Sequence, residues 1–229
     1  MRCLHHFLAA GLAVPCAVAA PPAAAGEIRV TVSVLTAEKK AVPGAGAVVW
    51  VVDAAAARAA AASAKPTIAS KSKRFDPRVA AVPAGGTVEF PNLDGIYHNV
   101  FSLSEKARFD LGLYRNGASR TMTFENPGLV RIYCNIHPQM AAVLVVIDGA
   151  IWAQADADGT AVLARVPAGK ATVRVWDEKG GDFTTAVDVP ASGAVPLVIS
   201  LDGSQWHETG HKNKYGKDYP PPDDDGNRY

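Results

Sequence analysis

Three residue types that bind soft metal ions stand close together in the pattern C-x-x-H-x-x-M, as Cys134, His137 and Met140. The residues before them alternate, so Val130 and Ile132 share one face of a predicted strand with Cys134, and the thiol points where core side chains point. A thiolate, an imidazole and a thioether on one tight turn suit copper, whose blue sites use two His, one Cys and a weak axial Met. One imidazole is missing from this turn.

His98 can supply the missing imidazole. It follows a turn at residues 92–95 that closes a predicted strand, and it precedes Cys134 by enough residues for a hairpin between them. Such a hairpin can bring the two segments side by side. The sequence therefore predicts one copper ion with His98, Cys134, His137 and Met140 as its ligands.

Each of these residues has a simpler explanation when it is taken alone. Cys134 could be a buried small hydrophobic residue or could pair between chains, His98 could be a surface or hydrogen-bonded core histidine, and Met140 could fill a gap in the core. Zinc is the closest chemical rival, but structural zinc sites use Cys, His and carboxylates. The thioether of Met140 argues for copper.

Residues 1–25 are typical of a secretory signal peptide, with a basic start at Arg2, an apolar run and small residues for cleavage. Its removal would leave Cys134 as the single thiol, because Cys3 and Cys16 would be lost. A lone thiol in an oxidising compartment needs a chemical reason. We expect a periplasmic or secreted protein without a membrane span, since the rest of the chain lacks an apolar run of about 18 residues.

The length of the chain bears on the number of domains, and its net charge bears on the kind of partner. A chain of 229 residues could hold two small domains. Its net charge of +1 gives no sign of a nucleic-acid or membrane-surface binder.

Short strands separated by turns predict an all-β protein. Hydrophobic and polar residues alternate over residues 27–34, and a second strand is expected at 47–52. Residues 54–64 are almost all alanine and form a short helix or a linker. Strand-length segments with Gly, Pro, Asn and Asp turns continue to residue 201, as in a sandwich or barrel. The polar residues 202–229 are expected to form an extended or disordered tail.

The segments around the ligands resemble the cupredoxin family, a Greek-key β-sandwich, and this domain is placed at residues 65–148. The ligand loop is short, like that of amicyanin. The motifs that carry the resemblance are Gly86-Thr87-Val88-Glu89-Phe90-Pro91-Asn92, His98-Asn99-Val100, Phe124-Glu125-Asn126-Pro127-Gly128 and the pattern from Cys134 to Met140.

The resemblance implies a role for each residue of the site. Cys134 would be the equatorial thiolate, His98 and His137 the equatorial imidazoles, and Met140 the axial ligand. Asn99 and Asn135 would stiffen the thiolate loop. The electron would pass through an exposed edge of His137, with Pro138 and Met140 near a partner-docking surface. Tyr133 could offer a second electron route or could be packed at the sheet edge.

Residues 149–201 resemble the carboxypeptidase-regulatory-like, transthyretin-like sandwich modules, through Asp156-x-Asp158-Gly159 and a motif from Val166 to Trp176. They hold too few strands for such a sandwich, and residues 27–53 would supply its opening strands. The cupredoxin domain would then be inserted into the second sandwich. The alternative assigns residues 27–53 to the cupredoxin as edge strands.

These features predict a one-electron carrier that cycles between Cu(I) and Cu(II), serves a redox partner protein of unknown identity, and is not an enzyme. A trinuclear oxidase cluster would need more histidines than His207 and His211 can add, and a dinuclear copper site would need a second thiolate. The alternative is a non-redox copper storage or delivery protein, or a surface-binding protein.

Three further groups of residues each allow two explanations. His207 and His211 could hold a second metal or be solvated. Lys71, Lys73 and Arg74 could dock an acidic partner or form a solvated loop. Asp156 and Asp158 could form a calcium loop, although a turn explains them adequately.

Overall fold

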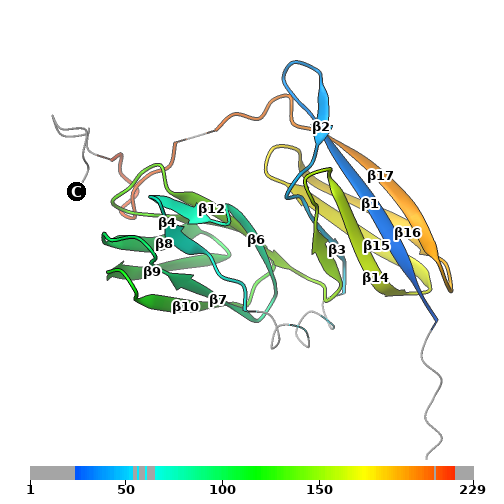
Figure 1. Ribbon diagram of the computed structural model, residues 1–229, viewed down its shortest axis with the longest axis horizontal. Helices are drawn as coiled ribbons and strands as arrows, with labels where there is room; N and C mark the ends of the chain where they lie inside the picture. The colour runs from blue at the N-terminus through cyan, green and yellow to red at the C-terminus, as the bar shows by residue number, and fades with distance from the viewer. Residues whose placement is uncertain (1–23, 54–55, 57–59, 61–64, 209, 220–229) are drawn as a thin grey trace, which may run out of the picture.

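The computed structural model describes residues 24–53, 56, 60, 65–208 and 210–219 (Figure 1). Cys3 and Cys16 of the predicted signal peptide, most of the alanine-rich segment 54–64 and the end of the predicted tail lie outside the described residues. Every element with assigned bounds is a strand, from β1 to β17. The predicted all-β sandwich fold is confirmed. Within the described residues, no helix has the length and hydropathy that a membrane crossing requires.

Two sheets, which we call the terminal sandwich, are built from both ends of the described chain. The alternation predicted for the first strand is confirmed, because Ile28, Val30, Val32 and Val34 are buried in the core between these sheets. One sheet contains β1 (Ala25–Leu35), β2 (Ala41–Pro43), β14 (Thr160–Pro167) and β17 (Ala194–Asp202), and the other β3 (Val48–Val51), β13 (Trp152–Gln154), β15 (Gly169–Asp177) and β16 (Gly181–Val189).

A second pair of sheets, the central sandwich, comes from the middle of the chain and encloses its own core around Phe90, Phe124 and Ile132. Its larger sheet has the order β6-β12-β11-β8-β9, and its smaller one pairs β10 with β7. A hairpin of β4 and β5 completes this part of the chain. The strands are β4 (Ala69–Lys71), β5 (Arg74–Asp76), β6 (Val79–Pro83), β7 (Gly86–Pro91), β8 (His98–Ser104), β9 (Ala107–Tyr114), β10 (Ser119–Phe124), β11 (Gly128–Tyr133) and β12 (Ala141–Ile147).

Strand β12 is buried on both faces. Leu144 and Val146 point into the central core, whereas Val143, Val145 and Ile147 join a separate apolar cluster. The partners in that cluster include Val48, Trp50 and Trp176 of the terminal sandwich and Ala81 of β6. The two sandwiches therefore pack directly against each other through β12.

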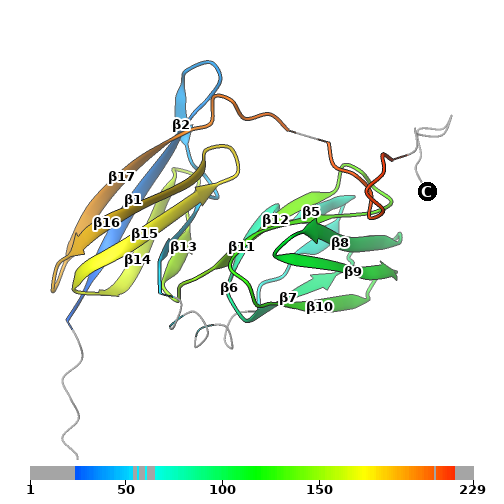
Figure 2. The ribbon, with the colours of Figure 1, turned by 180° about the vertical axis from the view of Figure 1, so that it is seen from behind.

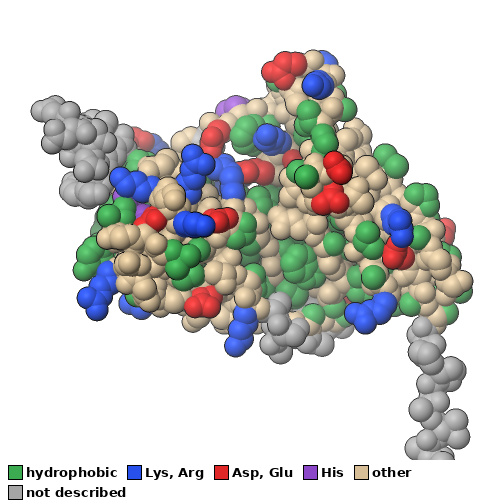
Figure 3. Space-filling model, viewed as in Figure 1, with side chains coloured by type: hydrophobic (Ala, Val, Ile, Leu, Met, Phe, Trp, Pro, Cys, Tyr) green, Lys and Arg blue, Asp and Glu red, His purple; other side chains and the backbone are tan. Residues whose placement is uncertain are grey.

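Polar contacts reinforce this junction. The indole N–H of Trp50 donates to the carboxylate of Asp148 at 2.7 Å, and Arg78 forms a bidentate ion pair with Glu178. Elsewhere, basic and acidic side chains are intermixed over the face drawn in Figure 3, in keeping with a net charge of +1.

The pairing of β1 and β3 bears on how the chain is divided. β1 pairs with β2, β14 and β17, while β3 pairs with β13 and β15. Residues 25–51 thus share sheets with residues 152–202, and β4 to β12 lie between them in sequence. These pairings favour an inserted central domain over edge strands added to it, and the domain boundaries themselves stay a prediction.

Part of the predicted extended or disordered tail is described by the structure. Residues 203–208 and 210–219 cross from the terminal sandwich to the central one, as Figures 1 and 2 both show. This segment has an ordered path because hydrogen bonds, rather than an apolar face, hold it. Lys214, for example, forms an ion pair with Asp110 at 2.7 Å.

Gly149 marks the point where the chain leaves β12 for the terminal sandwich. A Cβ at this position would lie 2.0 Å from the backbone oxygen of Val51 and 3.2 Å from the Trp50 ring. We expect Gly149→Ala to lower the free energy of unfolding by about 1–3 kcal/mol, because backbone atoms of two packed strands must move apart. Gly95→Ala is the control, since nothing lies within 4 Å of its Cβ position. Urea unfolding measures both variants, and equal losses would show that the junction is not closely packed.

Candidate metal centre

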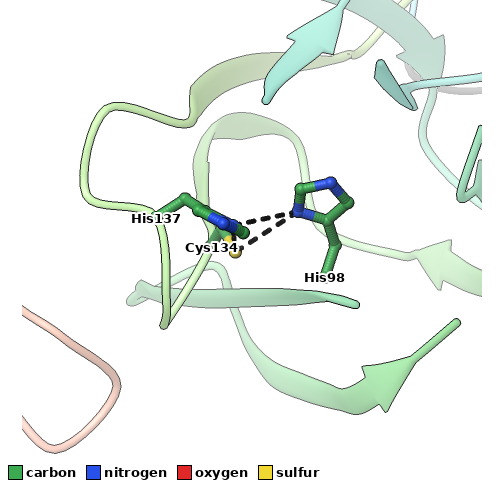
Figure 4. A group of neighbouring side chains, drawn as sticks. All are labelled: His98, Cys134 and His137. Carbon is green, nitrogen blue, oxygen red and sulfur yellow. Dashed lines mark hydrogen bonds between the residues drawn. The ribbon is translucent and has the colours of Figure 1, made fainter. Parts of the chain in front are cut away.

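The structure brings three of the predicted ligands together. The Nδ1 atoms of His98 and His137 are 3.1 Å apart, and the sulfur of Cys134 lies 4.0 Å from the first and 3.6 Å from the second. Figure 4 shows the three side chains turned toward one another. All three are buried, with Cys134 and His98 fully so. Among the described residues they form a group whose ligand atoms lie within 4.8 Å of one another and could hold a metal.

Strand ends position these ligands. His98 is the first residue of β8, Cys134 follows the last residue of β11, and β12 begins directly after Met140. The loop between β11 and β12, residues 134–140, is closed on itself. Its two ends are joined by a bond from Cys134 N to Met140 O at 3.3 Å, and Met140 N donates to His137 O at 3.0 Å.

Met140, the predicted axial ligand, is fully buried and packs in the same apolar cluster as Cys134. Its backbone bonds to Cys134 and His137 fix the position from which its side chain starts. Its role as a ligand stays a prediction.

Burial controls the protonation of the site. Desolvation raises the pKa of the Cys134 thiol, while the backbone N–H groups of Asn99, Ile136 and His137 act in the opposite direction by favouring the thiolate. Desolvation, together with the neighbouring His98 and Lys73, lowers the pKa of His137 to about 4. The imidazole of His137 is therefore neutral at pH 7, the form that binds a metal ion.

His98 has a carboxylate partner that was not predicted from sequence. Its Nε2 lies 2.8 Å from Asp94, and this carboxylate also accepts bonds from the backbone N–H groups of Ser72 and Lys73. Burial tends to raise the pKa of Asp94, but these bonds outweigh it and the pKa is lowered. A carboxylate on the far nitrogen orients a ligating imidazole and makes it more basic.

The turn at Ser72 and Lys73 directs their two backbone N–H groups toward the carboxylate of Asp94. Both residues have positive φ, 54° and 53°, which is the conformation of a type I′ turn between paired strands. Neither residue is glycine or asparagine, so sequence patterns gave no sign of this turn. Non-glycine residues held in the left-handed region cost free energy, and such residues cluster at functional sites.

The two asparagines expected to stiffen the loop both make hydrogen bonds at its start, and the stiffening itself stays a prediction. Asn99 accepts a bond from the backbone N–H of Asn135 at 3.3 Å and donates to Asp110 at 2.6 Å and to Gly112 O at 3.0 Å. The side chain of Asn135 accepts a bond from Lys214 N at 3.0 Å. Strands β8 and β9, the ligand loop and the C-terminal segment are thereby linked.

The expectation that His137 has an exposed edge is wrong, because the residue is only 3% exposed and its Nε2 is buried without a hydrogen-bond partner among the described residues. Met140 is fully buried and Pro138 is partly exposed, and a docking surface near these two residues stays a prediction. Tyr133 is half-buried with the ring of His211 stacked on it at 3.8 Å, and its role as an electron route stays a prediction.

His211 itself was expected to be solvated or to share a second metal with His207. It is half-buried, its Nε2 lies 2.7 Å from Pro138 O and its Nδ1 lies 3.0 Å from Lys212 O. His207 is exposed.

The other two groups are also located. Lys71, Lys73 and Arg74 are exposed on the β4–β5 hairpin, and their docking role stays a prediction. Asp156 accepts bonds from the backbone N–H groups of Asp158 and Thr160, which is the geometry of a turn.

Comparison with known proteins reaches only part of the chain. No protein-family model and no curated protein matches it. Similar solved structures include a copper-containing nitrite reductase from Thermus scotoductus SA-01, 26% identical over 36% of this chain and 22% of the reductase, with a TM-score of 0.35. A purple cupredoxin from Nitrosopumilus maritimus is 22% identical over 36% of this chain and 99% of its own, with a TM-score of 0.32. A reduced amicyanin variant is 20% identical over 44% of this chain and 98% of its own, with a TM-score of 0.35.

These structural neighbours are thus cupredoxins and an enzyme that is much longer than the matched part. The match spans less than a quarter of the reductase chain and less than half of this chain. The chain is similar to cupredoxins over that part only. The resemblance of residues 149–201 to carboxypeptidase-regulatory-like modules has no counterpart among these neighbours.

The carboxylate of Asp94 should be essential to the order of the site before any metal binds. In Asp94→Asn one amide oxygen replaces two carboxylate oxygens, so an N–H of Ser72, Lys73 or His98 faces the new NH₂ group. We expect the metal-free protein to lose about 1–3 kcal/mol of unfolding free energy, the cost of an unsatisfied donor. Asp158→Asn, in an exposed turn, should change it far less. Urea unfolding of both metal-free variants tests this, and an equal effect would contradict the assigned contact.

Proposed function

We propose that this chain is a type 1 copper protein that carries one electron at a time outside the cytoplasm. The observation that carries the proposal is the buried group of one thiol and two imidazole Nδ1 atoms within 4.8 Å of one another. Two imidazoles and one thiolate are the equatorial donors of blue copper sites. We assign His98, Cys134 and His137 to that plane and Met140 to the weak axial position.

Copper in such a site supplies a one-electron change between Cu(I) and Cu(II). The protein supplies the geometry and the surroundings. Asp94 orients His98, the backbone N–H groups of Asn99, Ile136 and His137 face the sulfur, and the apolar core keeps water away. Hydrogen bonds to a thiolate and the polarity around it tune the reduction potential.

Burial of the site favours electron transfer over the alternatives. An electron can leave a buried centre without any atom moving, whereas copper storage or delivery requires the ion itself to pass through the packed loop. An enzyme would need an open coordination position for its substrate. Cys134, His98 and Met140 are fully buried, which supports a carrier rather than a catalyst.

The finer organisation is proposed in the same way. We infer a cupredoxin domain at residues 65–148, inserted through the linker 54–64 into a carboxypeptidase-regulatory-like sandwich formed by residues 27–53 and 149–201. β-strand pairing supports the insertion. We further propose export by a signal peptide at residues 1–25, a periplasmic or secreted location, and a redox partner protein that receives or delivers the electron.

The visible spectrum of the copper-loaded protein tests the function. The full chain with one equivalent of Cu(II) should develop the intense thiolate-to-copper band of a blue site, and ascorbate should bleach it reversibly. Cys134→Ser should abolish the band because the thiolate donor is gone, while His207→Ala, at an exposed histidine, should retain it. A colourless wild type that binds Cu(I) or zinc in equal amount would contradict electron transfer and favour metal handling.

Met140 can be tested separately as the axial ligand. Met140→Leu should keep the thiolate band and raise the reduction potential, because loss of an axial donor destabilises Cu(II) more than Cu(I). Met122→Leu is the matched control, since Met122 packs against the same core as a partly buried residue. Redox titration of both variants measures the effect. If both potentials equal that of the wild type, Met140 is a core residue and not a ligand.

A further inference from the structure

The segment of residues 210–219, which we call the strap, lies against the ligand loop although it comes from the far end of the chain. Strand β17 ends at Asp202 in the terminal sandwich, and the chain then crosses to the loop of the central sandwich (Figure 2). The hydrogen bonds between the strap and the loop join residues that are 73 to 85 positions apart in the sequence. No alternating pattern links them, so the contact is carried by individual side chains.

Three strap residues bind the ligand loop directly. The hydroxyl of Tyr219 donates to the backbone oxygen of the thiolate ligand Cys134 at 2.8 Å. The Nε2 atom of His211 donates to the backbone oxygen of Pro138 at 2.7 Å, and Lys214 N donates to the side chain of Asn135 at 3.0 Å. The strap thus forms hydrogen bonds with three residues of the loop 134–140, namely Cys134, Asn135 and Pro138.

Aromatic rings of the strap also pack against rings of the larger sheet of the central sandwich. The ring of His211 stacks on Tyr133 at 3.8 Å with an angle of 16°, and Tyr219 meets His211 edge-on at 5.3 Å. Tyr133 packs in turn against Phe101 of β8 at 5.9 Å. The imidazole of His211 is therefore enclosed between two tyrosines.

The strap also reaches the residues that support the ligands from behind. The ammonium group of Lys214 is 2.7 Å from Asp110, and Asp110 accepts a bond from Asn99. Asn99 in turn accepts a hydrogen bond from the backbone N–H of Asn135, the residue whose side chain binds Lys214 N. Lys214, Asp110, Asn99 and Asn135 therefore form a ring of polar contacts around the start of the loop.

A turn of its own gives the strap a defined shape. Asn213 accepts bonds from the backbone N–H groups of Tyr215 and Lys217, and its own N–H donates to Lys217 O at 2.8 Å. Gly216 has φ of +74°, which favours glycine at this place. The strap therefore presents His211, Lys214 and Tyr219 from a folded segment and not from an extended chain end.

We propose that the strap holds the ligand loop closed, with Tyr219 and His211 as positioning residues that fix the carbonyl groups of Cys134 and Pro138 and keep water from the metal site. The proposal concerns the loop and its thiol, and it rests on the proposed copper function only for the spectroscopic readouts. By satisfying loop carbonyls and covering the side of the site next to Pro138, the strap keeps the loop in its ligating shape with or without a metal.

Water exclusion has a predictable effect on the copper site. The oxidised site carries one more positive charge than the reduced site, so water entering beside the loop stabilises the oxidised form and lowers the reduction potential. Loss of the strap should also let the loop open more often, which exposes the buried thiol of metal-free Cys134.

The first test measures how well the strap protects the Cys134 thiol in the metal-free protein. Iodoacetamide is added to the metal-free full chain, and mass spectrometry follows modification of the peptide that contains Cys134. Tyr219→Phe removes only the hydroxyl and should speed modification about fivefold, the effect of losing one hydrogen bond of about 1 kcal/mol. Tyr215→Phe is the matched control, because it removes the same hydroxyl from a strap side chain that is 72% exposed.

The second test uses the copper-loaded chain. A chain that ends at Glu208 keeps the Arg78–Glu208 ion pair but lacks the strap. We expect the thiolate band of the shortened chain to shift or weaken and its reduction potential to fall. His211→Ala should change the band and the potential in the same direction. His207→Ala should leave both unchanged. Circular dichroism shows whether each variant retains its strands.

The outcomes separate the strap from the copper function. Faster modification in Tyr219→Phe than in Tyr215→Phe supports the strap even if the wild type proves colourless. Equal rates in these two variants and in the wild type would overturn the proposal, since the loop would then be held closed by its own contacts. An unchanged potential and spectrum in His211→Ala and in the folded shortened chain would also overturn it.

Discussion

Burial of the Cys134 thiol between two imidazoles is the constraint on which the rest of the site depends. A thiolate there is costly without a cation, because desolvation opposes the charged form. The same burial, with His98 nearby, keeps His137 neutral. A metal ion among these three ligand atoms, which lie within 4.8 Å of one another, would supply the missing positive charge. Electrostatics and geometry therefore point to the same occupant.

The strands around the site hold that arrangement still. Strand β12 follows the ligand loop and is packed on both faces, by the central core and by the cluster that includes Trp50 and Trp176. The terminal sandwich thus acts as a support for one end of the loop, and β8 fixes His98 at the other side. The two imidazoles are held unequally. His98 has Asp94 on its far nitrogen, whereas the far nitrogen of His137 is buried without a partner among the described residues. The strap is placed on the side of the loop that contains His137.

The all-β fold and the grouping of His98, Cys134 and His137 could be predicted because both leave local patterns in the sequence. The alternation of Ile28, Val30, Val32 and Val34 records a strand with one buried face, and the spacing from Cys134 to Met140 places three donors on one turn. Asp94 was missed although it lies only four residues before His98, because a carboxylate in a turn has many other uses and its remaining partners, Ser72 and Lys73, meet it only in the folded chain. The Ser72-Lys73 turn itself lacks glycine. The strap was predicted to be part of an extended or disordered tail because it has no apolar periodicity. Asn213 and Gly216 were the available sign of a turn within it, and they could not show where the turn would dock.

X-ray absorption at the copper edge, on the full chain loaded with one equivalent of copper, identifies the donor atoms around the metal. We expect one sulfur at short distance and two imidazole nitrogens around a single copper, with the sulfur signal lost in Cys134→Ser and one imidazole signal lost in each of His98→Ala and His137→Ala. Copper surrounded by oxygen and nitrogen donors alone, with no change in these three variants, would contradict the assignment of the buried group as the metal site.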